Sequence, residues 1–286
     1  MALFPGFELT RIDCGDATLR VRIGGTGPPV LLLHGHPQTH VMWHRVAPLL
    51  ADAFTVVCPD LRGYGESSKP PTTDDHEPYS KRAMARDFAG LMTALGFETF
   101  SVAGHDRGGR VAYRLALDHP DRIDRLAVFD VVPTGEAWAR ADWCFVLTNP
   151  HWGFMAEPYP RPERVIGADP DAYYYAGDVS VFDPEALEDY RRCARDPETI
   201  HGMCEDYRAG AAFDRELDWS DKAAGRRVGC PVLVLWAGKD ELGEWYDPLA
   251  VWREWADDVS GRALDSGHFL AEERPDKVAA ELKAFF

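Results

Sequence analysis

One stretch decides the fold of this chain: Phe100-Ser-Val-Ala-Gly-His-Asp-Arg-Gly-Gly-Arg110. Residues 100–103 have the composition of a buried strand end, and residues 111–117 open an apolar helix. Between them, the sequence Gly-His-Asp-Arg-Gly predicts a sharp strand-to-helix turn that exposes the side chain of Asp106. A carboxylate held at such a tip can displace a leaving group from a saturated carbon and form an ester with the enzyme.

This turn resembles the G-x-nucleophile-x-G elbow of the α/β-hydrolase fold, in which an acid and then a histidine follow along the chain. Asp106 takes the position that serine usually holds. His268, in Asp265-Ser-Gly-His-Phe269, follows the last expected strand and is the predicted general base. Two residues are candidates for the acid that orients His268, because Asp130 and Asp240 each end a strand. We favour Asp130 on a resemblance given below.

The segments around the elbow alternate between short apolar runs and helical patterns. Such alternation predicts an α/β protein with a mostly parallel sheet and right-handed crossovers, here of eight strands with flanking helices. Strands are expected at 7–14 and 17–23, which form an antiparallel edge hairpin, and at 30–33, 54–60, 100–103, 126–129, 231–236 and 262–265. Helices are expected at 43–50, 80–95, 111–117 and 275–286.

The pattern changes between residues 134 and 221, where no buried strand is expected. This stretch is rich in aromatic residues, proline and charge, with helical pieces at 135–146, 184–194 and 199–210. We therefore predict an α/β-hydrolase core made of residues 1–133 and 222–286, with a helical cap of residues 134–221 inserted after the sixth strand.

Composition narrows the class of protein. The chain has 286 residues, 45% of them hydrophobic, which is enough for a large core. Its formal net charge of −16, without a basic tract, argues against nucleic acid or an anionic membrane as a partner. The six cysteines form no C-x-x-C pair, and neither a signal-peptide pattern nor a membrane-length apolar run is found. We expect a reduced, cytoplasmic enzyme.

Arg107 and Arg110 flank the candidate nucleophile within one helical turn. A helix N-terminus favours anions, so two cations there do not serve helix stability. Guanidinium groups hold a planar carboxylate by charge-assisted, often bidentate, hydrogen bonds. We predict that both arginines bind a substrate carboxylate, and the plain alternative is a buried structural ion pair.

The turn His34-Gly-His-Pro37 follows the apolar run at 30–33. It resembles the H-G-x-P turn of the epoxide hydrolase and dehalogenase branch of the fold. We expect it to aim the backbone N–H of His36 toward Asp106, so that the N–H groups of His36 and Arg107 form an oxyanion hole. His36 is unusual at the x position of this turn, where an apolar or aromatic residue is expected.

Three side chains of the expected cap carry donors that suit a small anion such as halide. His151 and Trp152 are adjacent and offer N–H groups, and Tyr207 offers an O–H. Each aromatic residue taken alone would more simply pack in the cap. The three residues together indicate a halide site only because a known family, named next, has the same residues in the same motifs.

Over nearly its whole length the chain resembles the fluoroacetate dehalogenases, which are haloacetate dehalogenases of the α/β-hydrolase fold. The shared motifs are D-R-G-x-R at 106–110, D-x-x-P-T at 130–134, H-W at 151–152 and C-E-D-Y-R-A at 204–209. The resemblance implies that Asp130 is the triad acid and that the enzyme is a homodimer without a cofactor; no metal is expected. It also assigns substrate contacts, with the carboxylate held by Arg107 and Arg110 and the departing halide by His151, Trp152 and Tyr207. His36 and the second acid, Asp240, depart from the family pattern.

The function predicted from these residues is hydrolysis of a small haloacid, namely haloacetate to glycolate and halide. Asp106 would form the ester, and water activated by His268 would hydrolyse it. The main alternative is an epoxide hydrolase, which needs two cap tyrosines; Tyr207 is one candidate, and the others are Tyr173, Tyr174, Tyr175 and Tyr190. A remote alternative is a non-catalytic protein that binds a small carboxylate. The sequence gives no halogen preference.

Overall fold

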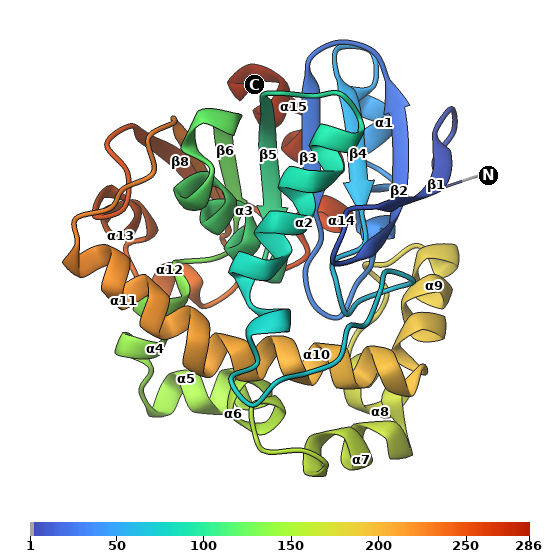
Figure 1. Cartoon of the computed structure of the whole chain (residues 1–286), viewed down its shortest axis with the longest axis vertical. Coiled ribbons are helices and arrows are strands. Elements are labelled where there is room, and N and C mark those ends of the chain that lie inside the picture. The colour runs from blue at the N-terminus through green and yellow to red at the C-terminus, as the bar shows by residue number, and fades with distance from the viewer. Residues whose placement is uncertain (1–2) are drawn as a thin grey trace.

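A sheet of eight strands runs through the centre of the molecule (Figure 1). The computed structural model describes residues 3–286. The strand order is β1-β2-β4-β3-β5-β6-β7-β8; β2 is antiparallel to both neighbours and the remaining pairs are parallel. The strands are β1 (Glu8–Asp13), β2 (Thr18–Gly25), β3 (Pro29–Leu33), β4 (Thr55–Pro59), β5 (Phe100–His105), β6 (Ile123–Phe129), β7 (Val232–Ala237) and β8 (Val259–Leu264). The predicted mostly parallel sheet with an antiparallel edge hairpin is confirmed.

Alternate residues of the central strands point into two different hydrophobic cores. In β3, Leu31 and Leu33 pack in one core while Val30 and Leu32 pack in the other, as the two-residue period of a strand requires. Side chains of α2 (Lys81–Ala94) and α3 (Arg107–Asp118) belong to the first core, and those of α1 (Ala47–Leu50), α14 (Leu270–Glu273) and α15 (Pro275–Phe285) to the second. Burial on both faces explains why these strands read as continuous apolar runs.

The carboxyl ends of the parallel strands bring the candidate catalytic residues to one edge of the sheet. β5 and β6 stay in parallel register to their last residues, His105 and Phe129. The residues that follow them, Asp106 and Asp130, therefore leave the sheet at the same level. β7 and β8 lead into the loops that carry Asp240 and His268. Ligands bind outside this edge in open α/β sheets.

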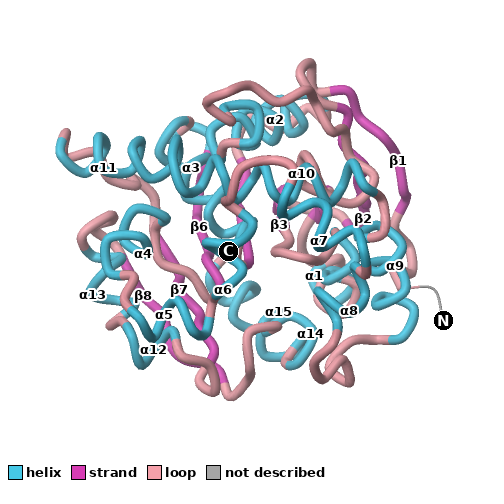
Figure 2. Tube along the Cα trace, turned by 90° about the horizontal axis from the view of Figure 1, so that it is seen from below, coloured by secondary structure: helices cyan, strands magenta, loops and turns pink. Residues whose placement is uncertain are grey.

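A run of helices between β6 and β7 lies across these strand ends (Figures 1 and 2). We call residues 134–223 the cap. Its helices are α4 (Thr134–Arg140), α5 (Trp143–Thr148), α6 (Pro150–Met155), α7 (Arg161–Ala168), α8 (Pro170–Tyr175), α9 (Pro184–Ala194), α10 (Pro197–Ala209), a π-helical turn (Gly210–Asp214) and α11 (Arg215–Ala223). Figure 2 views the molecule from the cap side, with α6, α7, α8 and α10 in front of the sheet.

Local differences from the expected elements have simple causes. The helix expected over 43–50 is only a 3₁₀ turn, His40–Trp43, followed by the four-residue α1, because Pro48 lacks an N–H and disfavours helix before it. The sequence analysis does not predict α6, α7 and α8, which are six to eight residues long and have proline as their first or second residue. It also misses α11, whose inward face carries Asp218 and Asp221 instead of an apolar stripe. Among residues 3–286, no helix combines the length and apolar character needed to span a membrane.

Candidate active site

The elbow holds Asp106 in a strained conformation at the amino end of α3. Its backbone lies at φ 46° and ψ −116°, a region that residues other than glycine rarely adopt. The glycines on either side are required by space, because a Cβ on Gly104 would come 2.3 Å from the Gly108 carbonyl oxygen and one on Gly108 would come 2.4 Å from that of His34. Close packing of strand, turn and helix therefore fixes the carboxylate above the sheet.

The Asp106 carboxylate is ionised and already touches one candidate oxyanion donor. The backbone N–H of His36 donates to Asp106 Oδ2 at 3.0 Å. Burial raises the pKa of Asp106, but the positive charges of His268, Arg107 and Arg110 among its neighbours outweigh burial and hold that pKa below its usual range. The ionised carboxylate, which this lowered pKa favours, is the form that acts as a nucleophile.

His268 is held by Asp130 rather than by Asp240. The ring Nδ1 lies 2.6 Å from Asp130 Oδ2 and 3.6 Å from Asp240 Oδ2. Asp130 is fixed in turn, because its Oδ1 accepts the backbone N–H of Ala237 at 3.0 Å. Its side chain is 2% exposed, whereas that of Asp240 is 29% exposed. The geometry thus supports Asp130 as the residue that orients the imidazole, with Asp240 as a second charge nearby.

The pKa of His268 depends on the charge of Asp106. Burial lowers the pKa of His268, but the hydrogen bond and charge of Asp130, with the charges of Asp106 and Asp240, raise it to about 9. Formation of an ester on Asp106 would remove one of these negative charges. The pKa of His268 would then fall, and neutral imidazole, the form that accepts a proton, would become more abundant when water must be activated.

The Asp106→Asn variant tests this coupling, because it removes the same charge while keeping the size of the side chain. We expect the pKa of His268 to be lower in the variant than in the wild type, as followed by an NMR titration of the imidazole protons. His119 caps the far end of the 12-residue α3, roughly 18 Å away, and serves as the internal reference. A His268 pKa that stays the same or rises would show that Asp106 does not control it.

Arg110 is a buried cation that forms no ion pair with a carboxylate among residues 3–286. Its Nη1 donates to the Val132 carbonyl oxygen at 3.0 Å and to Thr134 Oγ1 at 3.4 Å, and its Nε has no partner. Burial and the charge of Arg107 lower the pKa of Arg110, but a guanidinium stays charged in proteins. The ring of Trp152, 4.6 Å away, adds only a cation–π contact. A buried charge without a partner is costly, so this position favours an anionic ligand.

Arg107, by contrast, already has a carboxylate partner. Its Nε and Nη2 contact the Asp206 carboxylate oxygens at 2.7 and 3.0 Å. Asp206 also accepts hydrogen bonds from Lys81 and from Tyr64 Oη. In the part of the chain that the structure describes, Arg107 Nη1 has no hydrogen-bond partner, and this atom is the one left for a ligand. Sequence analysis missed Asp206, although it lies within the quoted C-E-D-Y-R-A motif at 204–209.

The candidate residues of core and cap face one cavity of about 620 Å³. Core and cap each contribute polar groups to its wall: His36, Asp106, Arg110, Asp130, Asp240 and His268 from the core, and His151, Trp152, Tyr173, Tyr174 and Tyr207 from the cap. Apolar groups complete it, among them Val132, Ala137, Phe145, Leu242 and Trp245. Arg107 is not among the residues that line this cavity, and its guanidinium carbon lies 4.2 Å from the centroid of the Tyr207 ring.

The three predicted halide donors lie together in this wall. The ring centroids of His151 and Trp152 are 5.6 and 6.2 Å from that of Tyr207. Burial and the charge of Asp106 raise the pKa of Tyr207 well above its usual value, so its O–H is kept. Burial lowers the pKa of His151 to about 4, which leaves a neutral ring with one N–H. Within residues 3–286, neither Trp152 Nε1 nor Tyr207 Oη has a hydrogen-bond partner.

The side chain of His36 also lies in this wall. The sequence alone does not decide whether this side chain reaches the pocket. Its ring is stacked on that of His151, at 6.2 Å between centroids, and meets Tyr174 and Tyr207 edge-on. Burial and the neighbouring His151 lower the pKa of His36 to about 3. The ring is therefore neutral and takes the place of the aromatic residue expected in this turn.

Two groups of acidic and histidine side chains in residues 3–286 bring their ligand atoms close enough together for a metal ion. In the first, formed by Asp130, Asp240 and His268, the His268 ring is hydrogen-bonded to Asp130 and lies 3.6 Å from the Asp240 carboxylate. The second, in the cap, consists of Glu163, His201 and Glu205, but Arg208 Nη1 donates to the Glu163 and Glu205 carboxylates at 2.6 and 2.7 Å. That position already holds a positive charge, so this cluster is a salt bridge.

Comparison with known proteins places this geometry in a family. The family model described as "alpha/beta hydrolase fold" matches residues 28–275. A fluoroacetate dehalogenase from Burkholderia sp is 48% identical over 290 residues, covering 99% of this chain and 95% of that protein. A soluble epoxide hydrolase from Corynebacterium sp. (strain C12) is 34% identical, covering 92% and 91%. A solved structure of a Nostoc sp PCC 7120 protein assigned to the alpha/beta hydrolases is 49% identical, with a TM-score of 0.95 and coverage of 98% and 97%.

Proposed function

The chain belongs to the α/β-hydrolase fold family. Within this family, we propose that it hydrolyses haloacetates to glycolate and halide. The observation that carries the proposal is the buried Arg110, which has no carboxylate partner in residues 3–286 and faces the same cavity as Asp106 and His268. A substrate carboxylate supplies the missing negative charge. The similarity to a fluoroacetate dehalogenase supports the same substrate class.

In the first step we propose that Asp106 displaces the halide. The substrate carboxylate binds to Arg110, whose charge no carboxylate in residues 3–286 neutralises, and this contact directs the halogen-bearing carbon toward Asp106. Arg107, whose Nε and Nη2 are paired with Asp206, would add only its remaining Nη1 donor. A carboxylate oxygen of Asp106 forms a bond to that carbon, and the carbon–halogen bond breaks with its electron pair going to the halide. His151, Trp152 and Tyr207 donate hydrogen bonds to the departing halide.

In the second step we propose that water regenerates Asp106. His268, held by Asp130, takes a proton from water, and the hydroxide attacks the carbonyl carbon of the Asp106 ester. The N–H of His36, with that of Arg107, stabilises the oxyanion that forms on the Asp106 oxygen. The ester bond then breaks with its electron pair going to the leaving oxygen, which takes the proton from His268, and glycolate is released. In line with the family resemblance, we also propose that the enzyme acts as a homodimer.

Epoxide hydrolysis is the second candidate function, because Tyr174 and Tyr207 both line the cavity. Two cap tyrosines would protonate an epoxide oxygen while Asp106 attacks carbon, and the similarity to a soluble epoxide hydrolase supports this reading. An uncharged epoxide, however, leaves Arg110 without an anion. The dehalogenase proposal accounts for that cation and is therefore preferred.

Substrate comparison separates the two functions. We expect halide release from chloroacetate and fluoroacetate, slow release from chloroacetamide, which lacks the carboxylate charge, and little turnover of styrene oxide. Arg110→Leu is expected to lower kcat/KM for chloroacetate about tenfold to a hundredfold, the loss of one charged hydrogen-bonding group. Free halide is measured by ion chromatography and diol formation by chromatography. Rapid turnover of styrene oxide without halide release from any haloacetate would overturn the dehalogenase proposal.

A further inference from the structure

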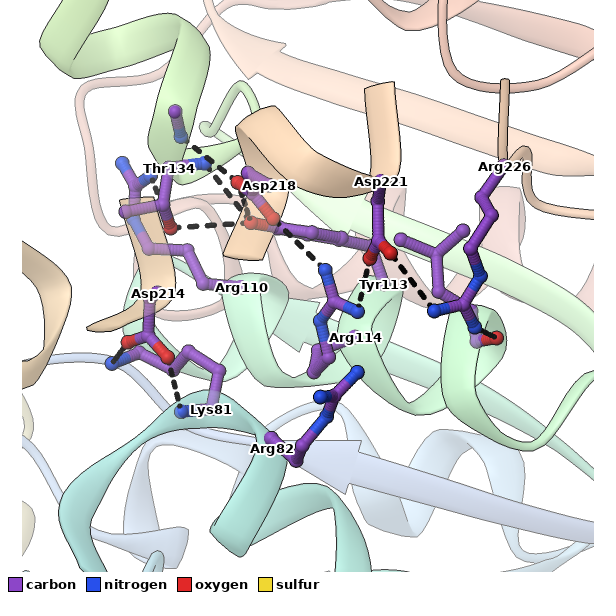
Figure 3. Close-up of polar contacts among 12 residues, drawn as sticks. Lys81, Arg82, Arg110, Tyr113, Arg114, Thr134, Asp214, Asp218, Asp221 and Arg226 are labelled. Carbon is purple, nitrogen blue, oxygen red and sulfur yellow. Dashed lines mark hydrogen bonds and ion pairs between the residues drawn. The ribbon is translucent and has the colours of Figure 1, made fainter. Parts of the chain in front are cut away.

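A line of hydrogen bonds runs from Arg110 away from the cavity to Asp218 of α11 (Figure 3). Arg110 Nη1 contacts Thr134 Oγ1 at 3.4 Å. Thr134 Oγ1 lies 3.2 Å from Tyr113 Oη, which also accepts the backbone N–H of Thr134 at 3.0 Å. Tyr113 Oη lies 2.6 Å from Asp218 Oδ2. The line thus passes from α3 through the start of the cap to the helix by which the cap returns to the core.

The hydrogens on this line can point in one direction only. Asp218 Oδ2 is a carboxylate oxygen and accepts, so the single O–H of Tyr113 is donated to it. Tyr113 Oη must then accept from Thr134, so the Thr134 hydroxyl donates its hydrogen to Tyr113 Oη. The lone pairs of Thr134 Oγ1 are left to accept from Arg110. The charge of Asp218 therefore turns two hydroxyl groups so that an acceptor faces the guanidinium.

Asp218 itself is firmly held. Its Oδ1 receives Arg114 Nη2 at 3.0 Å, and its Oδ2 also receives the backbone N–H of Gly135 at 2.8 Å. Arg114 is bound in turn to Asp221, one helical turn further along α11, at 2.6 Å (Figure 3). Asp218, Tyr113 and Arg114 are each 1% exposed. Buried, fully paired networks of this kind are rigid.

We propose that Asp218 is a positioning residue for Arg110, acting through Tyr113 and Thr134. A carboxylate in direct contact would neutralise the cation, as Asp206 does for Arg107. Two interposed hydroxyl groups fix the direction of the guanidinium and leave its charge for the substrate. The inference deepens the proposed function and rests on it, since it assigns Arg110 to the substrate carboxylate.

Single substitutions at Tyr113 and at Thr134 test the proposal. Tyr113→Phe and Thr134→Val each keep the shape of the side chain and break the line, whereas Thr134→Ser keeps the hydroxyl. We expect the first two to raise KM for chloroacetate about tenfold, as for one hydrogen bond to a charged group, with a smaller change in kcat. Their preference for chloroacetate over chloroacetamide should fall by a similar factor. Thr134→Ser should retain wild-type KM.

Tyr79→Phe is the matched control, because Tyr79 is also fully buried and, among residues 3–286, its hydroxyl bonds only the Pro70 carbonyl, at 2.7 Å. It should leave KM and the substrate preference unchanged. Calorimetric binding of glycolate adds a readout that does not need turnover, and it should weaken in Tyr113→Phe but not in Tyr79→Phe. If chloroacetate is not a substrate of the wild type, the proposed function fails, while the glycolate difference still supports the positioning role. If Tyr113→Phe, Thr134→Val and the control all have the same KM and the same affinity for glycolate, the positioning role of Asp218 is overturned.

Discussion

His268→Asn is expected to release one halide per active site from chloroacetate and then stop. The first step needs only the Asp106 carboxylate. The variant loses the charge of His268, the largest that lowers the pKa of Asp106, but keeps the charges of Arg107 and Arg110, which lower it as well. The second step needs a base, and Asn offers none. Loss of a catalytic histidine costs about 10⁴-fold or more in turnover, while the alkylation step retains its nucleophile. The ester on Asp106 should therefore accumulate.

Rapid-quench halide measurement and mass spectrometry of peptides check this result. The peptide that contains Asp106 should gain the mass of one carboxymethyl group after a single turnover. His119→Asn is the matched control, since it makes the same replacement at the far end of α3 and should sustain repeated turnover. Asp106→Asn should show neither a burst nor a modified peptide. A burst of halide that leaves the Asp106 peptide unmodified would rule out the ester mechanism.

The sequence predicts the core well because the core follows local rules. The elbow at 104–108 requires glycine where backbones touch, and the buried strands are continuous apolar runs, so both are visible in the residues themselves. The cap is less predictable. Three of its short helices, α6, α7 and α8, have proline as their first or second residue. In addition, α11 turns Asp218 and Asp221 inward, which a search for an apolar stripe overlooks. Only the positions of Arg114 and Tyr113 on α3 explain why acidic residues face the core there.

The partition of roles between Arg107 and Arg110 also needed the structure. The sequence treats them alike, since both lie within one turn of the nucleophile. Their difference comes from α10, which brings Asp206 to Arg107 and no carboxylate to Arg110. Contacts between segments about a hundred residues apart leave no local signal. Similarly, the positions of Asp130 and Asp240 after strands leave two candidates for the triad acid, and only the family resemblance favours Asp130. The structure supports the same choice by a difference of 2.6 against 3.6 Å to the His268 ring.

The halide donors are the second place where we expect a large effect, and the effect should depend on the halogen. Fluoride is a poor leaving group that concentrates its charge and accepts hydrogen bonds strongly, whereas bromide leaves easily and accepts weakly. Donors aimed at the departing halide therefore stabilise the transition state most for fluoride. Tyr207→Phe and Trp152→Phe each remove one donor and keep an aromatic ring. Loss of one donor to a developing anion costs about 2.7–4 kcal/mol, or roughly 10²–10³ in rate.

We accordingly expect fluoroacetate turnover to fall by up to this factor in each variant, with a much smaller fall for bromoacetate. The measured quantity is the ratio of the bromoacetate to the fluoroacetate rate, taken from single-turnover halide release so that the chemical step is observed. Tyr173→Phe is a suitable control, because Tyr173 lines the same cavity but is not one of the three proposed donors, and its ratio should match the wild type. An equal loss for both substrates in Tyr207→Phe and Trp152→Phe would mean that these residues shape the cap and do not hold the halide. A larger loss for fluoroacetate than for bromoacetate would assign the assistance to Tyr207 Oη and Trp152 Nε1. Arg110 cannot account for such a difference, because it is unchanged in both variants and contacts the carboxylate of both substrates.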